Sequence, residues 1–287
     1  MAFLIVSLVL GGMVFLAEVS LNSYILFVAG CRVERMASTL WFLNQAVANL
    51  IFIIFRPFRF ISIIIPDLEW AKRQSSTTTS LHMFSSAFFL TALSVDHCIL
   101  MARPEWAWNH RTHTMAFGVV LGTWALSLGF SLQYSDLLES LLSPASTSMN
   151  AGLDEGRVKA AVVIEFLVGF LIPLVLILIP TFYIILAAKL KRKRLIQSTK
   201  PFKILLGLIP TFFLSWLLHH VFSFLLISPK YTLPFLDMGR AFAWVLTYFS
   251  NCLNPIFYLT MEEEFLRYRK HAQNTQTTDN SGPEPAE

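Results

Sequence analysis

Charged residues are scarce in this sequence: Asp, Glu, Lys and Arg make up 14% of its 287 residues, against 55% hydrophobic residues. Soluble domains carry about 25% charged residues, so this chain has too little charge to cover a soluble surface. Its hydrophobic residues also gather in long runs. Both features predict an all-α membrane protein with several spanning segments and leave no room for a second globular domain.

Cysteine is also rare. Cys31, Cys98 and Cys252 are the three cysteines, and each lies inside or at the end of an apolar run. Because none falls in an expected external loop, we predict no structural disulfide. The sequence contains no metal-ligand cluster, no nucleophile elbow and no paired carboxylates. We therefore predict that the protein is not an enzyme and holds neither a metal nor a cofactor.

Apolar runs of about 20 residues are typical of transmembrane helices, and the chain has seven. They cover residues 3–29, 39–65, 77–102, 114–134, 158–188, 202–228 and 237–260. A signal peptide is the alternative for the first run, but that run lacks a basic start and continues through residue 28, which favours a retained helix.

The C-terminal part differs in composition from the seven runs. Residues 262–271 predict a short amphipathic eighth helix along the membrane, with Phe265 and Leu266 in the interface with the lipids. The polar residues that follow predict a disordered cytoplasmic tail. We therefore expect one membrane domain over residues 1–272 and a tail over residues 273–287.

Basic residues indicate the orientation. Most of the 22 Lys and Arg residues lie on one side of the expected bundle, including the run from Lys189 to Arg194, whereas loops on the other side carry acids beside bases. Cytoplasmic loops are enriched in Lys and Arg, so we expect that basic side in the cytosol and the N-terminus outside the plasma membrane. Because the basic residues follow the topology, we predict no nucleic-acid partner.

An Asn-Pro pair lies near the end of the last apolar run: Asn254 and Pro255, with Tyr258 about one turn later. A Pro inside an apolar helix removes one backbone hydrogen bond and kinks the helix. In a bilayer the freed groups need partners from neighbouring groups, and Asn254 is placed to supply one. This segment resembles the NPxxY motif that closes the seventh helix of rhodopsin-like (class A) G-protein-coupled receptors.

Other positions fit the same family. Asn22 resembles the Asn of its first helix, Trp124 the Trp of its fourth and Pro173 the Pro of its fifth. The segment 213–216 resembles the toggle-tryptophan segment of its sixth helix. The loop 103–112 resembles the chemoattractant branch, with its formyl-peptide, complement-anaphylatoxin and leukocyte-type prostaglandin D receptors.

The resemblance implies a fold, partners and a set of activation residues. The fold is a seven-transmembrane helix bundle with a short eighth helix, surrounded by membrane lipids. The partners are an extracellular lipid or peptide ligand, a heterotrimeric G protein and arrestin. Activation and G-protein coupling are assigned to Asp96, His97, Asn254, Pro255 and Tyr258.

Three departures from the family pattern bear on signalling. His97 follows Asp96 where the family has an Arg, and a mostly neutral imidazole lacks the fixed charge and five donors of a guanidinium. Asn49 replaces the Asp that binds sodium, so we predict a weak or absent sodium site. The Cys pair that joins the third helix to the second external loop is missing. Together they support an alternative, a ligand-binding decoy or signalling-impaired receptor.

Polar groups inside membrane spans are candidates for function, because burying them in lipid is expensive. The residues expected to form a ligand pocket are Arg56, Arg59, Met83, Glu165, Trp216, His219, His220, Phe222 and Tyr248. Chemoattractant receptors usually carry Lys or Arg at the position of Glu165. Glu165 either pairs with Arg56 or Arg59 inside the bundle, or belongs to a dipolar pocket that accepts a peptide end or a zwitterion.

A small membrane transporter is the remaining alternative. It would need inverted repeats or an ion path through the membrane. The sequence has no internal repeat, and its intramembrane charges are expected near the outer surface.

Overall fold

The structure is a computed structural model, and its described residues form helices and short connections without strands. The described residues are 2–31, 37–65, 67–103, 106–107, 110, 112–142, 151–190, 199–226, 239, 242–243, 246–248, 250–253 and 255–256. The helices are α1 (Ala2–Cys31), α2 (Ala37–Ile64), α3 (Glu69–Ala102), α5 (His113–Leu142), α6 (Ala151–Phe166), the π-helix η1 (Leu167–Leu171), α7 (Ile172–Leu190) and α8 (Thr199–Leu226).

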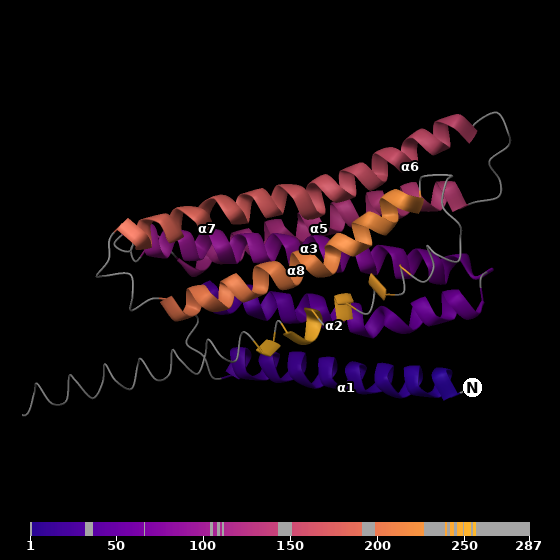
Figure 1. Ribbon diagram of the computed structural model, residues 1–287, viewed down its shortest axis with the longest axis horizontal. Helices are drawn as coiled ribbons and strands as arrows, with labels where there is room; N and C mark the ends of the chain where they lie inside the picture. Colours follow the sequence, from indigo (N-terminus) through magenta and orange to yellow (C-terminus); the bar gives the residue numbers. More distant parts are fainter. Residues whose placement is uncertain are drawn as a thin grey trace, which may run out of the picture.

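The helices form a bundle around α3, which contacts α2, α5, α7 and α8. The helix α1 packs against α2 on one side, and α6 continues through η1 into α7 as one long rod on the other (Figure 1). Successive rods run in opposite directions, so α1 begins at the same end of the bundle at which α2 ends and α3 begins (Figure 1). We refer to this end as the N-terminal end of the bundle.

Apolar side chains line both the inside and the outside of the bundle. Met83, Phe84 and Trp216 are almost completely buried in the core, whereas Phe182 and Leu214 are more than 60% exposed on the outer surface. Large exposed apolar surfaces mark contact with other molecules or with a membrane, and in lipid every helix also satisfies its own backbone. The inside-outside pattern is therefore that of a bundle surrounded by lipid.

Within the described residues, four helical stretches are long and apolar enough to cross a membrane. They are Leu40–Phe58, Thr114–Tyr134, Gly156–Tyr183 and Gly207–Leu225, and a shorter apolar stretch covers Gly12–Phe27. Each falls within an expected span or overlaps most of it. The last expected span is described only in part, and the expected eighth helix and tail lie outside the described residues.

Three helices extend beyond the expected membrane spans. The helix α3 begins at Glu69, before residue 77, α5 continues to Leu142, beyond residue 134, and α6 begins at Ala151, before residue 158. Hydropathy detects only the apolar part of a helix, whereas backbone hydrogen bonds continue through polar turns. At the start of α3 the helix is supported by Lys72, which donates to Glu69 over 3.1 Å.

The fifth expected span is one rod with a wider turn in its middle. Pro173 has no N–H to offer the carbonyl of Gly169, and just before it the N–H of Ile172 bonds to the carbonyl of Leu167, five residues back. This turn brings Gly169 so close to α3 that a Cβ on it would lie 2.5 Å from Cε of Met83. The wider turn before Pro173 is therefore a place of close packing between the rod and the central helix α3.

Candidate functional site

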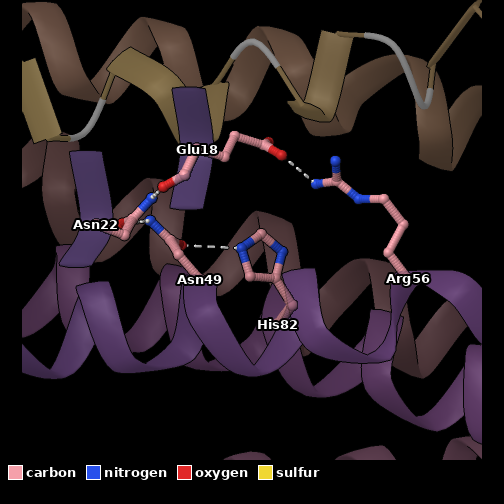
Figure 2. A network of polar contacts seen from close by, with 5 residues as sticks. All are labelled: Glu18, Asn22, Asn49, Arg56 and His82. Atoms are coloured by element: carbon pink, nitrogen blue, oxygen red, sulfur yellow. Dashed lines mark hydrogen bonds and ion pairs between the residues drawn. The ribbon is translucent and has the colours of Figure 1, made fainter. Parts of the chain in front are cut away.

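An ion pair between α1 and α2 lies inside the bundle. Nη2 of Arg56 is 2.5 Å from Oε2 of Glu18, and both side chains are almost completely buried (Figure 2). The sequence interpretation that pairs Arg56 with Glu165 is therefore wrong, because Glu18 holds the guanidinium from a different helix. Sequence reasoning also missed Glu18, although an acid inside the first apolar run was a visible signal. The side chain of Arg59 lies outside the described residues.

The last segment of the chain completes the surroundings of this pair. The guanidinium carbon of Arg56 lies 3.9 Å from the centre of the Tyr248 ring, well within the range of a cation–π interaction. Asn251 lies beside Glu18 and beside His82 of α3. Arg56 and Glu18 thus join the first, second and last membrane segments of the chain.

A small cavity lies against Arg56. It is lined by Phe52, Phe55, Arg56, Ser75, Thr78, Thr79 and Tyr248. Arg56 lies about two turns before the end of α2 and Ser75 about two turns after the start of α3, so the cavity lies toward the N-terminal end of the bundle. Nε of Arg56 has no hydrogen-bond partner within the described part of the chain. Of the expected ligand-pocket residues, Arg56 and Tyr248 line this cavity.

A network of neutral polar groups lies deeper in the bundle (Figure 2). Asn22 donates to the backbone carbonyl of Glu18 over 2.9 Å, and Asn49 donates to Oδ1 of Asn22 over 2.9 Å. Oδ1 of Asn49 lies 3.1 Å from Nε2 of His82 and also accepts from Gln45 over 3.1 Å. An amide oxygen can only accept a hydrogen bond, so with this amide orientation Nε2 of His82 carries the proton.

Asn49, which stands where the family carries its sodium-binding Asp, is part of this network. Gln45 donates to Oγ of Ser86 over 2.7 Å as well as to Asn49. The oxygens of Asn49 and Ser86 are thus already bonded to neutral donors of the protein itself. Sequence reasoning named Asn49 but missed Gln45 and His82, whose only signal in the sequence is that they are polar residues inside expected membrane spans.

Ring contacts connect the cavity with α8. The ring of Phe52, which lines the cavity, stacks on His82 with centroids 4.3 Å apart. The His82 ring lies 5.9 Å from the Trp216 ring, centroid to centroid. Two ring contacts therefore lead from the cavity wall to the tryptophan of α8.

A second polar cluster joins α6 to α8. Oε1 of Glu165 lies 3.6 Å from Nε2 of His219, and Glu165 is 1% exposed. The neighbouring His220 meets the rings of Phe166 and Phe170 edge-on, with centroids 5.5 and 5.2 Å away. Glu165 of α6 thus contacts α8, while Arg56 of α2 pairs with Glu18 of α1.

No group of three or more His, Cys, Asp and Glu side chains in the described ranges is arranged to hold a metal ion.

The other expected ligand-pocket residues pack against neighbouring segments. Met83 is completely buried beside Gly169 of η1, and Phe222 lies close to Gly239 of the last segment.

The motif residues lie in three places. Trp124 donates from Nε1 to Oδ1 of Asn44 over 2.9 Å. Asp96 and His97 are half-buried near the end of α3, where the next residue, Cys98, donates to the carbonyl of Pro180 over 3.8 Å. Pro255 is buried in the last segment, while Asn254 and Tyr258 lie outside the described residues.

Comparison with known proteins finds one matching family profile and several related receptors. The profile of the family described as 7 transmembrane receptor (rhodopsin family) matches residues 21–258. Chemerin-like receptor 1 of Bos taurus is 32% identical over 273 residues, which cover 86% of this chain and 75% of that protein. Formyl peptide receptor 2 of Mus musculus is 28% identical over 288 residues, which cover 91% of this chain and 81% of that protein. The profile match begins beside Asn22 and ends at Tyr258, the first and last of the motif residues.

Proposed function

Because this chain belongs to the rhodopsin (class A) family of seven-transmembrane receptors, in the branch of the chemerin-like and formyl peptide receptors, we propose that it senses an extracellular lipid or peptide ligand and signals to a heterotrimeric G protein. The N-terminal end of the bundle faces outward from the plasma membrane, and arrestin is a second cytosolic partner. The expected seven-helix receptor fold and the chemoattractant branch are confirmed by the family match and these relatives.

The observation that carries this proposal is the connection between the cavity at Arg56 and Trp216. A ligand group that enters the cavity meets Phe52, whose ring stacks on His82, and His82 lies next to Trp216. A ligand shifts a conformational equilibrium only through contacts that differ between the two states. Displacement of the His82 ring provides such a difference, because it changes the packing of α8 against α3 and so favours a different tilt of α8.

A second candidate function is a receptor that binds its ligand but signals poorly. It rests on His97, which stands at the cytosolic end of α3 in this orientation. A neutral imidazole cannot replace the permanent charge and fixed donors of the family's Arg in contacting a G protein.

One experiment separates the two candidates. Cells expressing the chain with an N-terminal epitope are first stained without permeabilisation, which also tests the proposed orientation. Cyclic AMP and calcium are then recorded during exposure to a panel of lipids and peptides, for the unmodified chain and for H97R. The exposed His110 gives the control H110R, which adds the same charge outside α3.

Equal responses of the unmodified chain and H97R support the signalling receptor. A response of H97R alone supports the signalling-impaired receptor, provided that H110R stays silent. Silence of all variants at the cell surface, in every G-protein class, contradicts the signalling receptor and also the assignment of a signalling defect to His97.

A further inference from the structure

The ion pair beside the cavity at Arg56 determines which charge a ligand group in this cavity can carry. In most sites built around an arginine, the guanidinium is available to an anionic group, because its planar donors match a carboxylate. Here Glu18 already occupies one side of the guanidinium at 2.5 Å, and the ring of Tyr248 covers a face at 3.9 Å. The charge of Arg56 is therefore balanced before any ligand arrives.

One donor of the same arginine lacks an acceptor. Nε of Arg56 is without a hydrogen-bond partner among the described residues, and Arg56 is only 6% exposed, so bulk water does not replace that partner. A buried donor that lacks an acceptor is unfavourable, because it has lost its hydrogen bond to water. The cavity borders Arg56, and Ser75, Thr78 and Thr79 line its wall. Thr78 and Thr79 already donate their hydroxyls to the backbone carbonyls of Gln74 and Ser75. The site therefore offers the Nε–H of Arg56 and a neutral total charge, between the rings of Phe52, Phe55 and Tyr248.

We propose that this cavity binds an uncharged hydrogen-bond acceptor, such as the carbonyl of an amide or ester at the end of the ligand, and that Glu18 excludes a free carboxylate. This inference rests on the proposed function, because it describes the ligand of that receptor. A neutral carbonyl satisfies Arg56 without adding charge. A carboxylate would place a second anion beside Glu18, which is 0% exposed, and a buried charge without its own counter-charge is strongly disfavoured.

The test uses three fragments of the same shape and different charge: benzamide, benzoate and benzamidine. Their binding to the purified full-length chain in lipid nanodiscs is measured at millimolar concentrations by saturation-transfer NMR. The unmodified chain is expected to bind neutral benzamide at least about tenfold more tightly than either ion, a difference of about 1.4 kcal/mol. Tighter binding of benzoate, or binding of none of the three, overturns the proposal.

Variants identify the role of Glu18. E18Q removes the competing anion, so benzoate is expected to gain at least about tenfold relative to benzamide. E69Q is the matched control, because Glu69 is an exposed carboxylate at the same end of the bundle, and its fragment preference should equal that of the unmodified chain. An unchanged preference in E18Q contradicts the assignment to Glu18.

E18Q leaves Arg56 buried without its counter-charge and can fail to fold. The double variant E18M/R56M avoids this, because replacing both partners of a buried ion pair by apolar residues is often neutral or stabilising. It should lose the preference for benzamide over benzoate, and retention of that preference overturns the proposal. All these measurements are independent of G proteins. Correct fragment ranking without signalling therefore contradicts only the signalling function, and the wrong ranking with normal signalling contradicts only this inference.

Discussion

Asn49 is the residue at which three helices are joined by side-chain hydrogen bonds. It belongs to α2 and donates to Asn22 of α1. Its Oδ1 lies within hydrogen-bond distance of Nε2 of His82 of α3. Gln45, one turn earlier in α2, donates to the same oxygen. Both the nitrogen and the oxygen of the Asn49 amide are therefore in hydrogen-bond contact with other side chains.

Replacing Asn49 by Ala should destabilise the bundle more than the same change at Asn44. N49A removes two hydrogen bonds between helices, with Asn22 and His82, and such bonds average about 0.6 kcal/mol in membrane proteins, so the unfolding free energy should fall by about 1 kcal/mol. N44A removes one bond between helices, from Trp124, and should cost about half of that. Each variant also removes one bond within its own helix, which Asn49 accepts from Gln45 and Asn44 donates to Leu40. Denaturant unfolding of the purified proteins in micelles measures both, and equal losses would show that the network at Asn49 adds no stability.

The sequence predicts some members of the site and misses others for a physical reason. Asn22 and Asn49 were identified by their places in a family pattern, and they do bond to each other. Glu18, Gln45 and His82 follow no such pattern. Their importance depends on how each helix is rotated about its axis and on which partner faces it, and neither property can be read from one sequence. The same limit explains why the sequence left the partner of Arg56 open and did not indicate Glu18.

At the scale of the element, the π-helix η1 determines how closely α7 and α3 approach each other. Its backbone turn places Gly169 against the ends of Met83 and Phe84, where a Cβ would lie 2.5 and 3.1 Å from their side-chain atoms. Only a residue without a side chain fits this contact unless Met83 moves. The packing of η1 and the choice of residue at position 83 are thus coupled.

A double-mutant cycle measures this coupling. G169A should lower the unfolding free energy by about 1–3 kcal/mol through overpacking. M83A alone should destabilise by leaving a cavity, but it also makes room for the new methyl group. The double variant should therefore be more stable than the sum of the two effects predicts, by at least about 0.5 kcal/mol.

The control for this cycle is Gly129→Ala in α5, where a Cβ would meet nothing within 4 Å. It should be neutral or stabilising by up to about 1 kcal/mol, because Ala favours the helix. Strict additivity of G169A and M83A would contradict the proposed contact.

The sequence predicted membrane spans, and the helices extend beyond them. The third span was expected to start at residue 77, because residues 69–76 are mostly polar, whereas the helix α3 already begins at Glu69. These polar turns border the cavity at Ser75, so the feature that hid them from a hydropathy search is the one that makes them suitable for a polar site.

At the scale of the whole molecule, the described part of the bundle is apolar outside and pairs buried polar side chains of different helices inside. Glu18 and Arg56 come from α1 and α2, and Glu165 and His219 come from α6 and α8. Both clusters connect neighbouring rods, so each rod needs a neighbour before its polar groups are satisfied. The seven runs were predictable from composition, whereas this pairing of rods was not.

The pair of Glu18 and Arg56 has a consequence for biosynthesis. While the ribosome is still making α2, α1 carries an unmatched carboxylate, and a single charge at the centre of a helix costs about 3 kcal/mol during insertion. We predict that α1 leaves the translocon together with α2, as a hairpin. In a glycosylation-based insertion assay, E18L should improve the integration of α1 alone but not that of an α1–α2 hairpin. Equal improvement in both would show that Arg56 arrives too late to assist the entry of α1 into the bilayer.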